Sequence, residues 1–521
     1  MIKIFIFLLT MSCCSIFSII CLNKEIYLEI SSFSIFSSFN WAWVWKIDMY
    51  SLIFSFIVLW ISMIIFIYSF SYMKYELEKV KFFIILFLFV SSMYVLIFSF
   101  NLSSLLMGWD GLGVSSFLLI FFFHSPKSVN SSLVTILINR LGDLFMIFSI
   151  GLSLIYYSWN YMLWPLFSMF LILMICAFFT KSAQMPFSVW LPKAMAAPTP
   201  VSSLVHSSTL VTAGIYILFR LPYSIWAEKS MLVLSTASLT MMISSLMAFS
   251  SFDCKEIVAF STMSHMSLIF MTLSINLHNL AFFHLCSHAL FKSLLFMCMG
   301  NLIFHEDNSQ DIRKLDFSLI NPMTKISGLI SIISMMGLPF MCGFYSKDGI
   351  FENITESSLV KIFVTSSLLT ALYSFRLMNL LFSNFFFYNE LKKINLMNWT
   401  IYIQSFLVSM GGSVFFWLVN SFYFIYPMLN LKMLILIFIM SGFMLSLKSF
   451  YIMKIINFYN LWFKMAYEIN FIYIKSKLML KLEKGWLNFV LIIVKNLKIK
   501  VILVSTLSMI AFLVFVLVFY G

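Results

Sequence analysis

Charged residues are scarce in this chain. Only 10% of its 521 residues are Asp, Glu, Lys or Arg, whereas an average soluble protein has about 25%. Hydrophobic residues make up 62% of the chain and aromatic residues 19%. A soluble core of this size does not need so much apolar surface. The composition therefore excludes an ordinary soluble protein and predicts a polytopic membrane protein.

Sequence signatures of redox centres and nucleotide sites are also absent. None of the eight cysteines forms a C-x-x-C pair, and most lie in apolar stretches, where a thiol usually acts as a small hydrophobic side chain. There is no G-x-G-x-x-G motif and no Walker loop. We therefore expect this chain to bind no cofactor and no metal. No small-residue cleavage site follows the apolar stretch 2–22, so we expect a first membrane span there.

Apolar stretches recur along the chain, and we expect about fifteen transmembrane helices. The positive-inside rule supports this count, because one set of alternate loops and span ends then holds thirteen Lys or Arg and the other set six. The N-terminus then lies on the inner side. The sixth and eleventh spans look interrupted. The expected spans are 2–22, 49–71, 80–99, 102–123, 131–156, 163–186, 198–221, 231–250, 256–275, 277–303, 324–346, 358–383, 401–422, 431–452 and 500–520.

The middle of the chain indicates an internal duplication. Two consecutive groups of five spans each have their interrupted span in fourth place, and an odd number of spans requires the second group to be inverted in the membrane. The predicted organisation is N-terminal helices at 1–79, a first five-helix repeat at 80–221, a second, inverted repeat at 222–383, additional helices at 384–452, a surface helix at 453–499 and a terminal anchor at 500–521.

Segment 453–499 differs from the rest because it is rich in lysine. Five lysines fall on one helix face at 100° per residue, which is typical of an amphipathic helix lying along the membrane surface. The alternative is a basic loop that contacts anionic lipid. A helix of this length is longer than one bundle needs, which suggests contact with partner subunits. The five lysines are Lys477, Lys481, Lys484, Lys495 and Lys498.

Three lysines, Lys181, Lys292 and Lys347, lie inside predicted spans. Placing a cation in hydrocarbon costs roughly 2.5–3.5 kcal/mol even on a lenient scale, so such a residue usually marks an ion pathway. Lys181 and Lys347 also lie in the two interrupted spans. A helix break is tolerated in a membrane only inside protein or along a wet cavity. Together these features predict a transporter core.

Two acids lie deep in spans. Asp110 is expected to pair with Lys181. The pair either changes the pKa of the lysine as the two residues separate, or is a static buried ion pair. Asp143 follows Arg140 by three residues, which favours a local ion pair on one helix face. Arg376 is a further charge inside a span that would tune its neighbours.

His284, His288 and Lys292 form one stripe on a helix, at i, i+4 and i+8. A proton relay fits this stripe, since histidine titrates near neutral pH. The alternatives are ordinary core histidines, or a metal site for which no third ligand is nearby. His206 would connect Lys181 to the stripe, and Asp348 would receive a proton from Lys347. Lys255 and His265 are weaker candidates. Lys255 lies at a span boundary, where a lysine usually extends its ammonium group to the membrane surface.

Seven motifs in this sequence resemble those of the antiporter-like subunits of respiratory complex I, and most closely its chain 5 family. They cover roughly residues 45–380. The motifs are GWDGLGVSSFLL at 108–119, NRLGD at 139–143, TKSAQMPFSVWLPKAMAAPTPVSSLVHSSTLVTAGIY at 180–216, IVAFSTMS at 257–264, FFHLCSHALFKSLLFMC at 282–298, SQDIRK at 309–314 and LPFMCGFYSKD at 338–348.

The resemblance implies a central polar axis for protons. Carried over residue by residue, the axis consists of Asp110, Lys181, His206, His284, His288, Lys292 and Lys347. This chain departs from the family at three points: Asp110 stands where the family more usually has glutamate, His265 stands where it often has glutamine, and one predicted span fewer is present. The departure at Asp110 and the lower span count, together with the small size and the abundance of Met and Phe, look like a mitochondrially encoded animal form.

The implied function is proton translocation across the mitochondrial inner membrane, coupled to electron transfer from NADH to ubiquinone in other subunits. FMN and iron–sulfur clusters are then expected in partner subunits, and the partners are neighbouring antiporter-like chains, supernumerary subunits and lipids such as cardiolipin. Nucleic acid is not an expected partner. The alternatives are a subunit of a multisubunit sodium/proton antiporter and a structural clamp that does not pump.

Overall fold

The structure is a computed structural model, and it describes residues 25–36, 39–154, 168–306, 309–313, 321–353, 357–382, 396–419 and 441. Within these ranges, each of the twelve spans predicted between residues 49 and 422 contains helix. Nine helices are long and apolar enough to cross a membrane, and two shorter apolar helices accompany them among the described residues. The predicted spans 2–22, 431–452 and 500–520 and the predicted surface helix 453–499 lie outside the described residues, Ser441 excepted.

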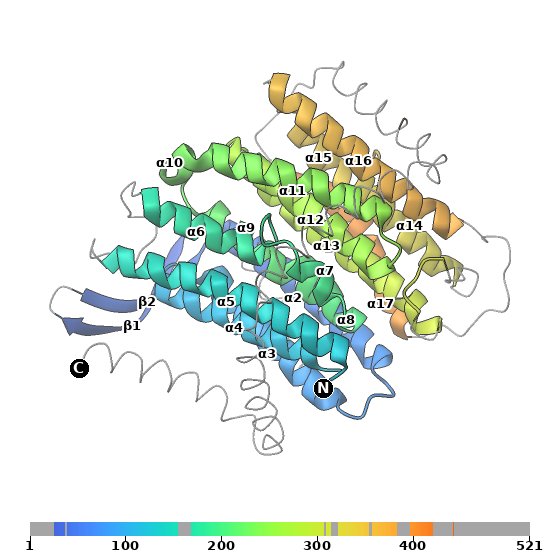
Figure 1. Ribbon diagram of the computed structural model, residues 1–521, viewed down its shortest axis with the longest axis horizontal. Coiled ribbons are helices and arrows are strands. Elements are labelled where there is room, and N and C mark those ends of the chain that lie inside the picture. Colours follow the sequence, from blue (N-terminus) through green and yellow to red (C-terminus); the bar gives the residue numbers. More distant parts are fainter. Residues whose placement is uncertain are drawn as a thin grey trace, which may run out of the picture. The chain divides into compact units, whose positions relative to one another are not determined.

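The elements follow one another in a nearly all-helical order (Figure 1). The bounds are β1 Ile26–Phe36, β2 Phe39–Ile47, α2 Met49–Tyr72, α3 Lys79–Phe98, α4 Leu102–Phe121, α5 Pro126–Leu154, α6 Ser168–Lys181, α7 Trp190–Ala194, α8 Thr199–Val201, π-helix η1 Ser202–Thr209, α9 Leu210–Arg220, α10 Tyr223–Trp226, 3-10 helix η2 Ala227–Lys229, α11 Ser230–Ser250, α12 Cys254–Ser274, α13 His278–His305, α14 Pro322–Met336, α15 Cys342–Glu352, α16 Ser357–Phe382 and α17 Leu396–Val419.

Strands β1 and β2 form an antiparallel hairpin, so the prediction of an all-α chain is wrong for this segment. The segment before α2 alternates and is rich in aromatic residues, which is a strand pattern. The hairpin covers the junction of α3 and α4: Trp45 stacks on Phe98 with ring centroids 6.3 Å apart, and the amide of Phe100 donates to the carbonyl of Val44 at 3.0 Å.

A buried ion cluster joins this hairpin to two helices. Asp48 caps the N-terminus of α2 by accepting a hydrogen bond from the amide of Ser51. Its carboxylate also binds the guanidinium of Arg220, at the end of α9, and lies 3.6 Å from the ammonium of Lys46. Burial works against ionisation of Asp48, but the charge and hydrogen bond of Arg220 outweigh it and lower the pKa of Asp48.

Helix α13 lies at the centre of the described bundle. In Figure 1 helices α11, α12 and α13 run between the group α3–α6 and the group α14–α16. Helix α13 packs against α12, α14, α15, α17, α2 and η1. The 18-residue apolar stretch of α13 is entirely buried, whereas only 33% of the corresponding stretch of α5 is buried. A helix enclosed on all sides is the position in which ionisable side chains are shielded from lipid.

Both interruptions predicted from the sequence are present. Helix α6 ends at Lys181, and the next helical turn begins at Trp190, whose indole Nε1 donates to the carbonyl of Thr180 at 2.8 Å and so satisfies a freed backbone group. The second break follows Met336, where Gly337 adopts the left-handed φ of 86° and α15 starts at Cys342. The π-helix η1, which follows the first break, was not predicted.

Serine and threonine hydroxyls in the helices mostly form hydrogen bonds within their own helix. They donate to carbonyl oxygens three or four residues earlier, as Ser62 does to Leu59 at 2.8 Å and Ser331 does to Gly328 at 2.6 Å. Such local bonds allow polar side chains to lie inside an apolar bundle without a partner on another helix. The buried lysines and histidines of the bundle, several of which bond to groups on other helices, form the candidate site.

Candidate functional site: buried lysines and histidines of the bundle

The stripe predicted on α13 is fully buried. His284, His288 and Lys292 each have 0% exposure. The Lys292 ammonium donates to the hydroxyl of Ser261 on α12 and contacts the sulfur of Met335 on α14 at 3.1 Å. All three residues lie on the single helix α13, as the spacing predicts. Sequence reasoning missed Ser261 and Met335, because neither residue type signals an ion pathway by itself.

His284 forms a hydrogen-bonded chain with residues of two other helices. Its Nε2 lies 3.2 Å from Nδ1 of His265 on α12, and its Nδ1 lies 2.9 Å from the hydroxyl of Ser346 on α15. Ser346 in turn lies 3.2 Å from the hydroxyl of Ser287. His265, a weaker candidate from the sequence, thus contacts the predicted stripe directly.

Lys292 and Lys347 meet at one residue. The Lys347 ammonium donates to the carbonyl of Met335 at 2.7 Å and lies 3.4 Å from the hydroxyl of Thr370, while Lys292 contacts the sulfur of the same methionine. Because both ammonium groups contact the same methionine, they repel each other when both are protonated. Asp348 is half-buried, and its charge acts favourably on Lys347.

Lys181 does not form the predicted direct pair with Asp110. No ion pair joins the two within the described ranges. Instead, the Lys181 ammonium donates to the carbonyl of Trp109 at 3.3 Å and lies 5.1 Å from the centroid of its ring. The charges of Asp143 and Asp110 both act on Lys181, that of Asp143 more strongly. The short aspartate side chain at position 110 is consistent with this arrangement.

Asp143 connects two parts of the site. It forms the predicted local ion pair with Arg140, at 3.3 Å, and its carboxyl group also interacts with that of Asp110. The exposures of the pair differ, because the side chain of Asp143 is 7% exposed and that of Arg140 is 53% exposed. Asp110, Asp143, Arg140 and Lys181 therefore form one cluster of four charges on α4, α5 and α6.

His206 lies between the two groups in the sequence and is fully buried in η1. Its ring is 6.2 Å from that of Trp190, and neither ring nitrogen has a hydrogen-bond partner among the described residues. Lys255 is only 5% exposed and donates to the carbonyl of Ala197 at 2.9 Å, so the sequence-based view of a snorkelling boundary lysine is wrong.

Arg376 is not close to the histidines. Its guanidinium donates to the carbonyl of Phe249 and lies 5.6 Å from the centroid of the Phe252 ring, at the turn between α11 and α12. The structure therefore brings together Lys292, Lys347 and the α13 histidines in one group and Lys181 with the two acids in another, with Arg376 outside both.

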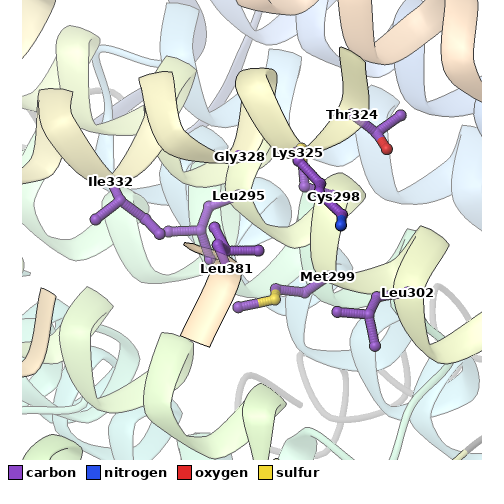
Figure 2. Close-up of a pocket in the computed structure, with 9 residues that line it drawn as sticks. All are labelled: Leu295, Cys298, Met299, Leu302, Thr324, Lys325, Gly328, Ile332 and Leu381. Carbon is purple, nitrogen blue, oxygen red and sulfur yellow. The ribbon is translucent and has the colours of Figure 1, made fainter. Parts of the chain in front are cut away.

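A small cavity lies one helical turn from Lys292, between α13 and α14 (Figure 2). Its volume is about 10 Å³, which is room for a single water. Leu295, Cys298, Gly328 and Ile332 form part of its mostly apolar wall, and Lys325 and Thr324 lie at one end. This space is too small for a substrate or cofactor. Among the described residues no group of three His, Cys, Asp or Glu is arranged to hold a metal ion.

Gly113 on α4 keeps space open for Lys181. A Cβ at this position would lie 3.2 Å from the Lys181 ammonium. In Gly113→Ala we expect the ammonium to move away from the Trp109 carbonyl, which weakens a charged hydrogen bond by about 1 kcal/mol. Alanine favours helix over glycine, so the thermal midpoint should not fall. A structure of the variant locates the ammonium, and thermal unfolding gives the midpoint. An ammonium that stays in place, or a lower midpoint, contradicts the prediction.

Comparison with known proteins agrees with this arrangement. Residues 99–373 match the family described as NADH:quinone oxidoreductase/Mrp antiporter, TM, and residues 33–83 match NADH-Ubiquinone oxidoreductase (complex I), chain 5 N-terminus. NADH-ubiquinone oxidoreductase chain 5 of Anopheles quadrimaculatus is 41% identical over 452 residues, which are 82% of this chain and 78% of the mosquito protein. The chain belongs to the NADH-ubiquinone oxidoreductase chain 5 family.

Other chain 5 proteins are similar over a shorter length. That of Locusta migratoria is 46% identical over 346 residues, covering 64% of this chain and 60% of the locust protein. The family resemblance predicted from the seven motifs is thereby confirmed, and these two relatives are insect proteins, in line with the predicted animal form.

Solved structures share the fold of this chain. A chain of the Mrp complex from Dietzia sp. aligns with a TM-score of 0.72 at 20% identity, over 94% of this chain and 59% of that chain. A chain of the archaeal membrane-bound sulfane sulfur reductase aligns with a TM-score of 0.70 at 20% identity, over 80% of this chain and 90% of that chain. The described bundle therefore has an antiporter-like membrane fold.

Proposed function

We propose that this chain translocates protons across the mitochondrial inner membrane as a core subunit of complex I. The observation that carries the proposal is the burial of six ionisable side chains in spans of one chain: Lys181, His206, His265, His284, His288 and Lys292 each have 0% exposure. Dry burial of polar ring nitrogens is costly. His206 and His288 lack partners among the described residues for both ring nitrogens, and this supports wet positions along a proton path.

The charges suggest how protons would be held and released. In this proposal the carboxylates of Asp143 and Asp110 attract the ammonium of Lys181, and moving them away from the lysine would release its proton toward His206 and the α13 stripe. A proton arriving on Lys292 would then repel one on Lys347, since both contact Met335. Lys347 would pass its proton to Asp348 for release. In this proposal, conformational or electrostatic change in neighbouring chains supplies the driving force.

The proposed setting is a larger assembly. This chain would take part in NADH:ubiquinone reductase activity without a redox centre of its own, with FMN and iron–sulfur clusters in partner subunits. The position of Arg140 is evidence for a neighbouring membrane subunit. Its side chain is 53% exposed near the middle of α5, beside the exposed Leu137, Leu141 and Leu144. An arginine facing lipid at this depth is costly. Supernumerary subunits and lipids such as cardiolipin complete the proposed surroundings.

The proposed architecture has about fifteen spans, two inverted five-helix repeats, a lateral helix at 453–499 and a final anchor. Matching contacts support the repeats. Helix α3 packs on α4 as α11 packs on α12, and α5 packs on α6 and α7 as α13 packs on α14 and α15. Each group also has its interrupted helix in the same place, at Lys181 in the first and after Met336 in the second.

A direct test replaces Lys181 with alanine. We expect Lys181→Ala to lower the ratio of protons moved to electrons transferred, because the fully buried cation that begins the proposed path is removed. The ratio is measured with the complex in sealed vesicles that oxidise NADH. Lys127→Ala, which removes an exposed lysine at the start of α5, is the matched control and should leave the ratio unchanged. An unchanged ratio in an intact Lys181→Ala complex would refute the proposal.

A further inference from the structure

His265 occupies a special place beside the α13 stripe. It comes from α12, has 0% exposure, and its ring centroid lies 5.4 Å from that of His284 and 5.6 Å from that of His288. His284 and His288 belong to the same helix, and within the described chain no hydrogen bond joins one ring to the other. The imidazole of His265 is thus adjacent to both members of a pair that is not directly bonded.

The hydrogen bonds give this group a direction along which a proton can pass. His265 Nδ1 faces His284 Nε2 at 3.2 Å, and His284 Nδ1 faces the Ser346 hydroxyl at 2.9 Å. The far nitrogen of His265, Nε2, is buried and has no partner among the described residues. A neutral imidazole has one donor and one acceptor nitrogen, so the two rings must be bonded head to tail.

We propose that His265 is a proton-relay residue of this chain, which carries protons between His288 and His284. A proton added at His265 Nε2 allows the Nδ1 proton to leave for His284 Nε2, and the Nδ1 proton of His284 then leaves for the Ser346 hydroxyl. Ser346 in turn gives up its own hydroxyl proton toward the Ser287 hydroxyl, 3.2 Å away, which passes a proton on in the same way. One proton enters and one leaves, while both rings change tautomer and must be reset before the next transfer. The proposal rests on the function proposed above and adds to it a residue from α12.

The test compares two replacements of His265 in the intact complex. His265→Gln keeps a polar side chain that can hold His284 by a hydrogen bond but cannot pass a proton by ionising. His265→Phe keeps a ring and removes the hydrogen bond. We expect both variants to slow coupled NADH oxidation about tenfold, less than the hundredfold typical of a lost acid–base group, because water can take over part of the transfer. The solvent deuterium isotope effect on the coupled rate should rise in both.

The outcomes separate relay from support. If His265→Gln matches the unchanged protein in rate and isotope effect while His265→Phe is slow, then His265 only positions His284 and the inference is overturned. If both variants match the unchanged protein, it is overturned as well. Lys181→Ala, measured in parallel, separates the two proposals: a normal proton-to-electron ratio there refutes the proposed function, whereas a lowered ratio with a normal His265→Gln complex refutes only the role of His265.

Discussion

Replacing Gly343 with alanine is expected to prevent correct packing of the second interrupted helix. A Cβ at Gly343 would lie 1.7 Å from the carbonyl oxygen of Ser334, a backbone atom that cannot rotate away. Helices α14 and α15 would have to separate. Overpacking in a well-packed core typically costs about 1–3 kcal/mol, and we expect a value at or above the top of this range because the contact is with backbone.

The same change should disturb Lys347. Gly337, which begins the break, approaches the aliphatic part of the Lys347 side chain, and a Cβ there would lie 3.3 Å from its Cδ. Opening the α14–α15 contact therefore moves the lysine as well as the backbone. We expect little Gly343→Ala subunit in the assembled complex on native electrophoresis, and a lower thermal midpoint for the fraction that assembles.

Gly151→Ala is the matched control for Gly343→Ala. Gly151 also lies in a helix, α5, but nothing approaches its added Cβ within 4 Å. Alanine is favoured over glycine in a helix by about 1 kcal/mol, so this variant should assemble normally. Normal assembly and an unchanged midpoint in Gly343→Ala would show that α14 and α15 do not approach each other as closely as described.

The second large effect is expected at the buried ion cluster. Asparagine caps a helix about as well as aspartate does, so Asp48→Asn keeps the N-cap of α2 and removes mainly the charge. The side chain of Arg220, which is 8% exposed, then loses the carboxylate that compensates it, whereas Lys46 keeps its ion pair with Glu25 at 3.1 Å. Removing one partner of a buried ion pair typically costs about 3–5 kcal/mol. Limited proteolysis of this subunit during heating of the complex measures the loss.

An exposed ion pair supplies the comparison for Asp48→Asn. Glu78 and Lys81 lie 2.8 Å apart on the surface, with side chains 50% and 64% exposed. Surface pairs are worth at most about 1 kcal/mol, so Glu78→Gln should change the midpoint only slightly. Equal effects of Asp48→Asn and Glu78→Gln would contradict the proposed importance of burial.

The pH dependence of the Asp48 contribution has a definite sign. Because Arg220 holds the pKa of Asp48 below its usual value despite burial, this group stabilises the folded state fully above the unfolded pKa of about 3.9. The contribution disappears as the pH falls through the lower pKa of the folded state. The difference in midpoint between the unchanged protein and Asp48→Asn should therefore be constant from about pH 5 to 8 and shrink in stronger acid.

Features with a local cause were predictable from the sequence. The stripe of His284, His288 and Lys292 follows from helical periodicity, and the pair of Arg140 and Asp143 follows from a spacing of three residues. The helix breaks follow from proline and glycine. In each case the residues that decide the structure are close together in the chain, so the argument needs no knowledge of which helices are neighbours.

Features that depend on contacts between helices were harder to predict. Lys181 binds the carbonyl of Trp109 and not the adjacent carboxylate of Asp110, and this choice depends on how α4 and α6 face each other. The same holds for Met335, Ser346 and His265, which reach the stripe from other helices. The hairpin β1–β2 could have been found from its alternating aromatic pattern. The π-helix around His206 had no clear local signal.

The hydroxyl groups that bond within their own helices affect how the chain is inserted into the membrane during its synthesis. Serine hydroxyls that bond within their own helix, such as Ser62 in α2 and Ser331 in α14, need no partner on another helix when the segment enters the bilayer. Helix α13 is different, because its Lys292 and His284 find their partners on α12, α14 and α15. Biogenesis must therefore keep α13 in a protected, water-accessible environment until the segments on both sides of it have been synthesised.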